Sequence, residues 1–232
     1  MQAKAIMGFK PILSCAAFLA AAAVSTSANA ALLDGNFDTT PGGTTFTTFN
    51  AGQTFGAGAW TVGDGAANSG SNSGSIDLIG AYWQAPPGGG QSVDLDGMAP
   101  GSISQNFSLA AGTYQLSFEL SGNPEGGDPT KTVGVSVGDV TNQQFSFITG
   151  SNTKPAMGFL NETLTFTTPG PTTLSFVSQD GAPSFWGPVI GNVSVTAVPE
   201  PATAALAILG LGAIGFATRR RRAGGMLNAA IT

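Results

Sequence analysis

The most restrictive feature of this sequence is a series of short segments in which apolar and polar residues alternate. Residues 114–120 read YQLSFEL, so that Tyr114, Leu116, Phe118 and Leu120 would share one side of an extended chain. The same period of two recurs at residues 133–137, 145–147, 164–166, 174–176 and 193–195. This period is typical of strands with one buried face. Glycine- and proline-rich turns separate the segments, and together they predict an all-β sandwich.

The region before these segments is less regular. Residues 40–74 are rich in Gly, Thr and Asn, which predicts long loops around a strand near Trp60. Val62 would share a strand face with Trp60, so we expect Trp60 in the core.

The N-terminus has the pattern of a secretory signal peptide. Two lysines precede an apolar run over residues 12–24, and Ala28 and Ala30 flank Asn29 in the small-x-small pattern that signal peptidase accepts. We therefore predict a signal peptide over residues 1–30, with cleavage after Ala30.

The C-terminal region contains a long uncharged segment. Residues 202–218 include no charged side chain, and as a helix they would span about 25 Å at 1.5 Å per residue. Because a bilayer core is about 30 Å thick, this predicts a short transmembrane helix. Arg219, Arg220, Arg221 and Arg222 would stay in the cytoplasm, with the preceding body outside. The alternative is a helix in the core of the domain.

The same region resembles a PEP-CTERM sorting signal. Pro199, Glu200 and Pro201 precede the apolar segment and the arginine cluster, in the order and spacing of such signals over residues 199–222. The resemblance implies that exosortase, a membrane enzyme, recognises the tail, cuts near the Pro-Glu-Pro motif and passes the protein to the cell surface. The protein would thus cross the inner membrane, be anchored transiently and end at the surface or outside the cell. A short tail at residues 223–232 departs from the usual pattern.

A second resemblance covers the body of the chain, predicted as one domain over residues 31–198. Its segments LLDGNFD, AWTV, SIDLI, YW, QSVDLDG, GSISQ, LSGNP and GNVSV, between residues 32 and 195, resemble the choice-of-anchor C domain. That domain is related to a domain of unknown function found in plant cell-wall proteins. The resemblance implies a galactose-binding-like jelly roll whose partners are wall or matrix polysaccharides.

The resemblance also implies a candidate site for a structural calcium ion. Jelly rolls of this shape can hold calcium near the first and last strands, where Asp38 would supply one oxygen ligand. Relatives carry Asp immediately before the Asn-Val pair of the last strand, whereas this chain has Gly191. The loss of that carboxylate weakens the expected oxygen cage.

Composition excludes several function classes. Between residues 31 and 198 two lysines stand against twelve carboxylates, so the body would repel a nucleic acid backbone. The chain has no His, and its one Cys, Cys15, lies in the predicted signal peptide, so the mature body has no Ser-His-Asp triad and no His-ligated zinc. A glycosidase-like carboxylate pair remains, with Asp77, Asp94, Asp96, Glu119 and Asp180 as candidates. These acids also fit solvated strands and loops, and we expect no enzyme activity.

Candidate carbohydrate-binding residues are aromatic and acidic. Sugars stack on aromatic rings and hydrogen-bond to nearby amides and carboxylates. Tyr82, Trp83 and Gln84 form one candidate group, and Trp186, in a Gly/Pro loop, is a second platform. In an extended segment the rings of Tyr82 and Trp83 would point opposite ways, so one would face a ligand. The alternatives are that Tyr82 or Trp83 fills the core between the sheets, and that Trp186 packs its own loop.

Three carboxylates either belong to this candidate binding surface or simply face solvent. Asp94 and Asp96 flank Leu95, and Glu119 alternates with core residues, so in strands all three would point away from the core. They would either accept hydrogen bonds from sugar hydroxyls or simply face water.

Together these features predict an exported, surface-sorted and non-catalytic β-sandwich that is associated with exopolysaccharide, in the manner of a carbohydrate-binding module. The alternatives are a structural matrix or biofilm component without a defined ligand site, and a carboxylate-pair glycosidase.

Overall fold

The computed structural model describes residues 32–199 and 209–211, and residues 32–199 belong to one compact unit. The elements in chain order are β1 (Phe46–Asn50), β2 (Thr54–Phe55), β3 (Trp60–Asp64), η1 (Ala66–Asn68), β4 (Ser75–Ile79), β5 (Ser92–Asp94), β6 (Gly101–Phe107), β7 (Gly112–Gly122), β8 (Thr130–Val137), β9 (Val140–Ile148), β10 (Leu160–Thr168), β11 (Thr172–Ser178) and β12 (Pro188–Ala197).

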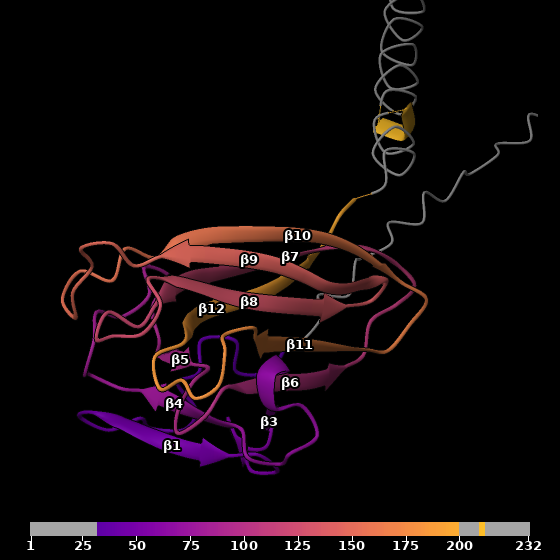
Figure 1. The fold of residues 1–232 in the computed structure, drawn as a ribbon. Coiled ribbons are helices and arrows are strands. Elements are labelled where there is room, and N and C mark those ends of the chain that lie inside the picture. Colours follow the sequence, from indigo (N-terminus) through magenta and orange to yellow (C-terminus); the bar gives the residue numbers. More distant parts are fainter. Residues whose placement is uncertain (1–31, 200–208, 212–232) are drawn as a thin grey trace, which may run out of the picture. The chain divides into compact units, whose positions relative to one another are not determined.

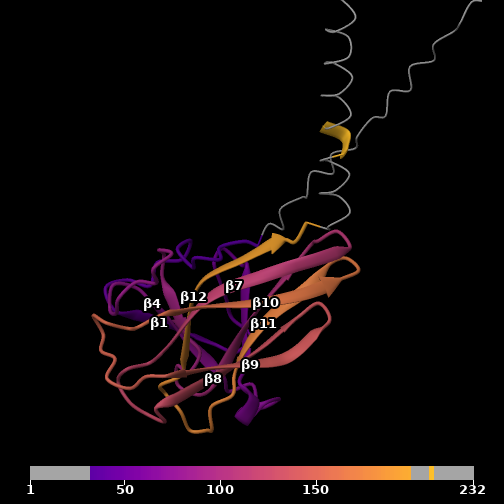
Figure 2. The ribbon, with the colours of Figure 1, turned by 90° about the horizontal axis from the view of Figure 1, so that it is seen from above.

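The strands form two antiparallel sheets of six strands each. The first sheet has the order β1-β4-β5-β12-β7-β10, and the second has the order β2-β3-β6-β11-β8-β9. In Figure 1 the first sheet runs from β10 at the top to β1 at the bottom. In Figure 2 β12, β7 and β10 lie on one side, with β8 and β9 on the other. The predicted all-β sandwich is confirmed.

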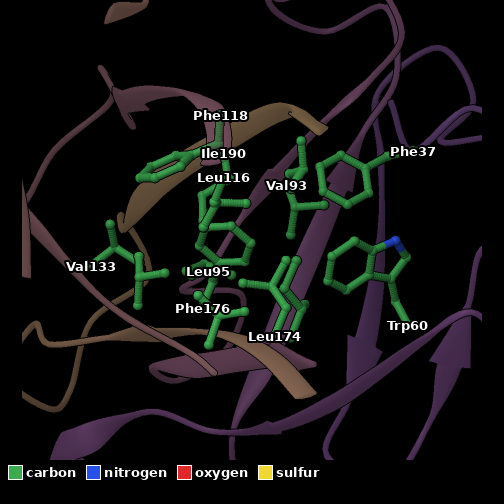
Figure 3. Packing of buried hydrophobic residues seen from close by; sticks show 14 of the residues in the cluster. Phe37, Trp60, Val93, Leu95, Leu116, Phe118, Val133, Leu174, Phe176 and Ile190 are labelled. Carbon is green, nitrogen blue, oxygen red and sulfur yellow. The ribbon is translucent and has the colours of Figure 1, made fainter. Parts of the chain in front are cut away.

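The alternating residues fill the space between the sheets. Leu116 and Phe118 of β7 and Ile190 of β12 point toward Val133, Leu174 and Phe176 of the second sheet (Figure 3). All six segments with a period of two lie within strands, because each offers one apolar face to this core.

The region over residues 40–74 contains more strand than the sequence predicted. β3 contains Trp60, which is fully buried and donates its indole N–H to the Asp34 carbonyl oxygen across 3.0 Å. Trp60 is therefore a core residue, as predicted. β1 and β2 were missed, because glycines and threonines surround their few apolar residues.

The predicted terminal segments lie mostly outside the described residues. Residues 209–211 are helical, whereas the signal peptide with Ala28 and Ala30, the rest of the apolar segment, and the arginine cluster are not described. Within residues 32–199 and 209–211, no helix has the length and apolar character needed to span a membrane.

Candidate functional site

The outer face of the first sheet carries a groove of about 310 Å³. Its floor includes Thr48 of β1, Asp77 of β4 and Asp94 of β5, which lie side by side because the strands pair them directly. Ile76 and Leu78 flank Asp77 in the strand and point into the core. The walls come from Tyr82, Trp83, Met98, Asn123, Glu125, Phe185 and Trp186. A larger hollow of about 480 Å³ lies among Gly112, Gly138 and Pro169, but no aromatic residue lines it.

Two adjacent aromatic residues in the groove are open to solvent. Phe185 is 43% exposed and Trp186 is 37% exposed. Their rings meet edge to face, with centroids 5.9 Å apart and an interplanar angle of 78°. The pair therefore offers apolar surface of the kind that stacks on a sugar ring.

The backbone around Trp186 is held by two buried ionisable side chains. Lys131, which is 1% exposed, donates from Nζ to the carbonyl oxygens of Trp186 and Gly126. Asp94 accepts from the Gly187 N–H across 3.0 Å. The Trp186 indole also packs on Gly126, where an added Cβ would approach Cε2 to 3.0 Å. Trp186 thus packs its loop, as one alternative expected, and still presents surface to the groove.

Tyr82 and Trp83 point to one shared partner. The Tyr82 hydroxyl donates to Glu125 Oε1 across 3.2 Å, and the Trp83 indole N–H donates to Oε2 across 3.2 Å. Residues 81–83 form a turn and a bend, so the extended geometry in which the two rings would point opposite ways does not occur here. Lys154 Nζ lies 2.9 Å from Glu125 Oε1 and contacts the Tyr82 hydroxyl. These hydrogen bonds, to Tyr82 first and then to Glu125, raise the pKa of Lys154.

Trp83 does not fill the space between the two sheets. It is nearly buried, but it packs with Ile79, Met157 and Val189 in a separate cluster, with Tyr82 at the edge. Ile79 and Val189 belong to the outer face of the first sheet, so this cluster lies beneath one wall of the groove. Gln84 is outside the groove lining, and its side-chain oxygen accepts from the Met157 N–H across 2.7 Å.

Asp94 and Asp96 do not face water, and this corrects the sequence prediction. Asp94 is 1% exposed and Asp96 is 0% exposed. Asp94 does point away from the core, but Asn123 and Gly187, from the loops on either side, pack against its carboxylate. Asp94 Oδ1 accepts from the N–H groups of Asp96 and Gly187, and Oδ2 accepts from Asn123 Nδ2 across 2.6 Å. Burial, and next the charge of Asp96, raise the pKa of Asp94 well above its usual value.

The other predicted acids have separate surroundings. No donor among the described residues forms a hydrogen bond to either carboxylate oxygen of Asp96, whose pKa is raised by burial. The nearby Ser178 and Ser184 hydroxyls moderate the rise in the pKa of Asp96, although neither forms a hydrogen bond with its carboxylate. Glu119 is also buried, outside the groove lining, and accepts from the Gly88 N–H across 2.9 Å. Burial raises the pKa of Asp180 to about 6.

Asp77 and Asp94 are the one candidate pair of acids that the groove lining brings together among the described residues. Both oxygens of Asp94 are occupied by protein donors, so this carboxylate is committed to holding loops. Asp77 accepts from the Thr48 hydroxyl across 2.5 Å and keeps its second oxygen for other contacts. Burial raises the pKa of Asp77.

The predicted calcium ligand does not lie in a cage. Asp38 is exposed and accepts from Asn36 Nδ2 across 2.6 Å. A Cβ at Gly191 would approach Cγ of Pro86 to 2.4 Å, so no acidic side chain fits there. Within residues 32–199 and 209–211, no cluster of three or more acidic, His or Cys residues has a metal-binding arrangement. Asp38 therefore has no acidic partner at Gly191, and a calcium ion at this position stays a prediction.

Sequence reasoning missed several groove residues: Phe46, Met98, Asn123, Glu125 and Phe185. Phe185 adjoins Trp186, and its place in the same Gly/Pro loop was a usable signal. Glu125 follows Pro124 in a turn with no pattern that indicates a partner. Its position beside Tyr82 results from the pairing of distant strands.

Comparison with known proteins identifies the body of the chain. The family model described as "Protein of unknown function (DUF642)" matches residues 30–196. The chain belongs to the DUF642 family. The narrower assignment to the choice-of-anchor C domain stays a prediction. The PEP-CTERM protein-sorting motif matches residues 197–222 of this DUF642 protein.

A curated relative and three solved structures resemble the DUF642 chain. Halomucin of Haloquadratum walsbyi is 33% identical over 138 residues, which is 56% of this chain but 1% of halomucin. A family 35 carbohydrate binding module from Clostridium thermocellum gives a TM-score of 0.42 at 13% identity, over 66% of this chain and 99% of that one. CBM35 from Paenibacillus barcinonensis gives a TM-score of 0.37 at 19% identity, over 66% of this chain and 99% of that one. A CBM4 structure gives a TM-score of 0.39 at 14% identity, over 72% of this chain and 99% of that one.

Proposed function

We propose that this DUF642 protein is exported to the cell surface and binds polysaccharide there, without catalysing a reaction. The exposed Phe185–Trp186 pair carries the proposal, because it forms an apolar platform beside polar groups that can bind sugar hydroxyls. Asp77, which keeps one carboxylate oxygen for other contacts, supplies such a polar group in the groove lining. The PEP-CTERM match supports sorting to the surface, and we propose exopolysaccharide as the ligand class there.

Hydrogen bonds anchor the backbone of the platform. Lys131 and Asp94 hold the backbone of residues 186 and 187 from two directions. A fixed aromatic surface loses little conformational entropy on binding, which favours affinity for a weakly interacting ligand such as a glycan.

The surroundings of the acids favour binding over hydrolysis. A glycosidase needs one carboxylic acid and one carboxylate free to reach the scissile bond. Asp94 is 1% exposed and accepts three hydrogen bonds from the protein. We therefore expect no release of reducing sugar from bound polysaccharide.

A glycan array with the purified full chain in mild detergent tests the binding proposal. We expect binding to a subset of glycans, which Trp186→Ala weakens at least tenfold, or about 1.4 kcal/mol. Ile148→Ala is the matched control, because Ile148 is exposed on β9 and lies outside the groove lining. If the folded protein bound no glycan, the proposal would fail in favour of a structural matrix component.

Sorting is tested separately in a strain that lacks exosortase. We expect an unprocessed, membrane-bound chain in that strain, and a C-terminus near Pro199–Pro201 in the parent strain. Mass spectrometry of surface and membrane fractions distinguishes the two forms. Equal amounts of processed protein on both cell surfaces would contradict the role of the PEP-CTERM segment.

A further inference from the structure

Among the described residues, the groove lining contains acids and no basic side chain. Asp77, Asp94 and Glu125 all line it, whereas neither Lys131 nor Lys154 does. Thr48 donates a hydrogen bond to Asp77, and burial raises the pKa of Asp77 without any contribution from a cationic neighbour.

Both lysines of the body are already engaged. Lys131 is buried and donates to two backbone carbonyl oxygens. Lys154 forms an ion pair with Glu125 and contacts the Tyr82 hydroxyl. All four arginines of the sequence lie at residues 219–222, outside the body.

An anionic sugar would therefore find no free counter-charge in the described part of the chain, because Lys154 is already paired with Glu125 and Lys131 is buried against the Trp186 carbonyl oxygen. A carboxylate, sulfate or phosphate group would lie near like charges in a partly buried setting, where Coulomb repulsion is weakly screened. A neutral sugar meets the same acids differently, because its hydroxyl groups donate hydrogen bonds to carboxylate oxygens.

On the basis of the proposed function, we infer that the groove selects uncharged polysaccharide and rejects polysaccharide that carries uronate, sulfate or phosphate groups. The aromatic pair supplies the attraction, and Asp77 on the groove floor supplies the discrimination. Repulsive features of this kind are a common source of specificity.

The sharpest test compares an acidic polysaccharide with its own carboxyl-reduced form. Reduction converts each uronate carboxylate into a neutral hydroxymethyl group and leaves the linkages unchanged. A panel of such matched pairs is titrated with the purified full chain by calorimetry, once with a calcium chelator and once with calcium. For pairs that bind, we expect the reduced form to bind at least tenfold more tightly at low ionic strength.

Asp77→Asn tests whether the groove itself discriminates. The amide keeps the oxygen that accepts from Thr48 and removes a charge, so we expect the preference for the neutral form to shrink severalfold. Asp139→Asn removes one charge outside the groove lining and should leave the preference unchanged. Thermal unfolding of each variant checks that it is folded.

The outcomes separate this inference from the proposed function. Binding of the acidic form as tightly as the reduced form, with or without calcium, overturns the inference, while Trp186-dependent binding would still support the function. An Asp77→Asn variant with an unchanged preference also overturns it. Binding of no glycan, charged or neutral, overturns both.

Discussion

Gly187 donates its backbone N–H to the Asp94 carboxylate across 3.0 Å, although 93 positions separate the two residues. Gly187 follows the exposed Trp186, and Asp94 is the last residue of β5 in the interior of the first sheet. An added Cβ at Gly187 would lie 2.6 Å from Cγ of Asp96, so this close approach requires glycine. The acids beneath the groove therefore position its aromatic platform.

Asp94→Asn should lower the free energy of unfolding by roughly 1–3 kcal/mol. Asn123 Nδ2 donates to Asp94 Oδ2 across 2.6 Å, and the new amide would place a second N–H donor against it. Chemical denaturation measures the loss. Adding Asn123→Asp exchanges donor and acceptor and should recover at least half of it, and a double variant as unstable as the sum of both single variants would contradict this arrangement.

Lys131→Met should reduce both stability and glycan affinity. It leaves the carbonyl oxygens of Trp186 and Gly126 without their charged donor, at a cost of roughly 1–3 kcal/mol. Denaturation and glycan titration measure the two effects. Lys154→Met is the control for stability, because solvent screens that partly exposed ion pair and it adds little to stability. Equal losses of stability in both variants would argue against an anchoring role for Lys131.

Stability should fall as pH rises from about 4 to about 6. Asp180 has its pKa raised from 3.8 to about 6, so the native state binds this proton more tightly than the unfolded state does. The proton's stabilising effect is present at low pH and is lost as pH rises through this window. Asp94 and Asp96, whose pKa values are also raised, act in the same direction. Asp64 and Asp139 have lowered pKa values, so their contribution to stability is lost only as pH falls below about 4.

Asp180→Asn should flatten this pH profile. The amide keeps the oxygen that accepts from the Thr132 N–H, and it removes a charge whose other oxygen has no hydrogen-bond partner among the described residues. Thermal unfolding at pH 4.5 and 7.5 compares the two proteins. A variant with the same difference between the two pH values as the wild type would show that Asp180 is not responsible.

Gly191→Asp should destabilise the protein and should not create a calcium site. The new side chain would collide with Pro86, whose Cγ would lie 2.4 Å from the added Cβ. Overpacking of this kind costs roughly 1–3 kcal/mol. Unfolding is measured in calcium and in a chelator, and a variant that calcium stabilises would contradict the expectation.

The candidate site was only partly predictable. Trp186 was identified from its place in a Gly/Pro loop, and Tyr82 because it adjoins Trp83 and Gln84 just before a Pro-Pro-Gly-Gly-Gly segment. Glu125, the partner of Tyr82 and Trp83, was not identified, because it lies 43 positions from Tyr82 and only the fold brings the two together. Asp94 and Glu119 were assigned the correct side of the first sheet but the wrong exposure, since alternation says nothing of a loop that covers the outer face.

By itself, the sequence determined the two-layered β-architecture and the identity of most core side chains. Alternation at residues 114–120 and 174–176 depends only on the geometry of an extended chain, which directs neighbouring side chains to opposite faces. Tertiary structure alone decided that Asp94 is buried beneath the loop of Trp186, and that Tyr82 and Trp83 share one carboxylate. These contacts depend on how loops fold back over a sheet, which is a long-range property that no local pattern encodes.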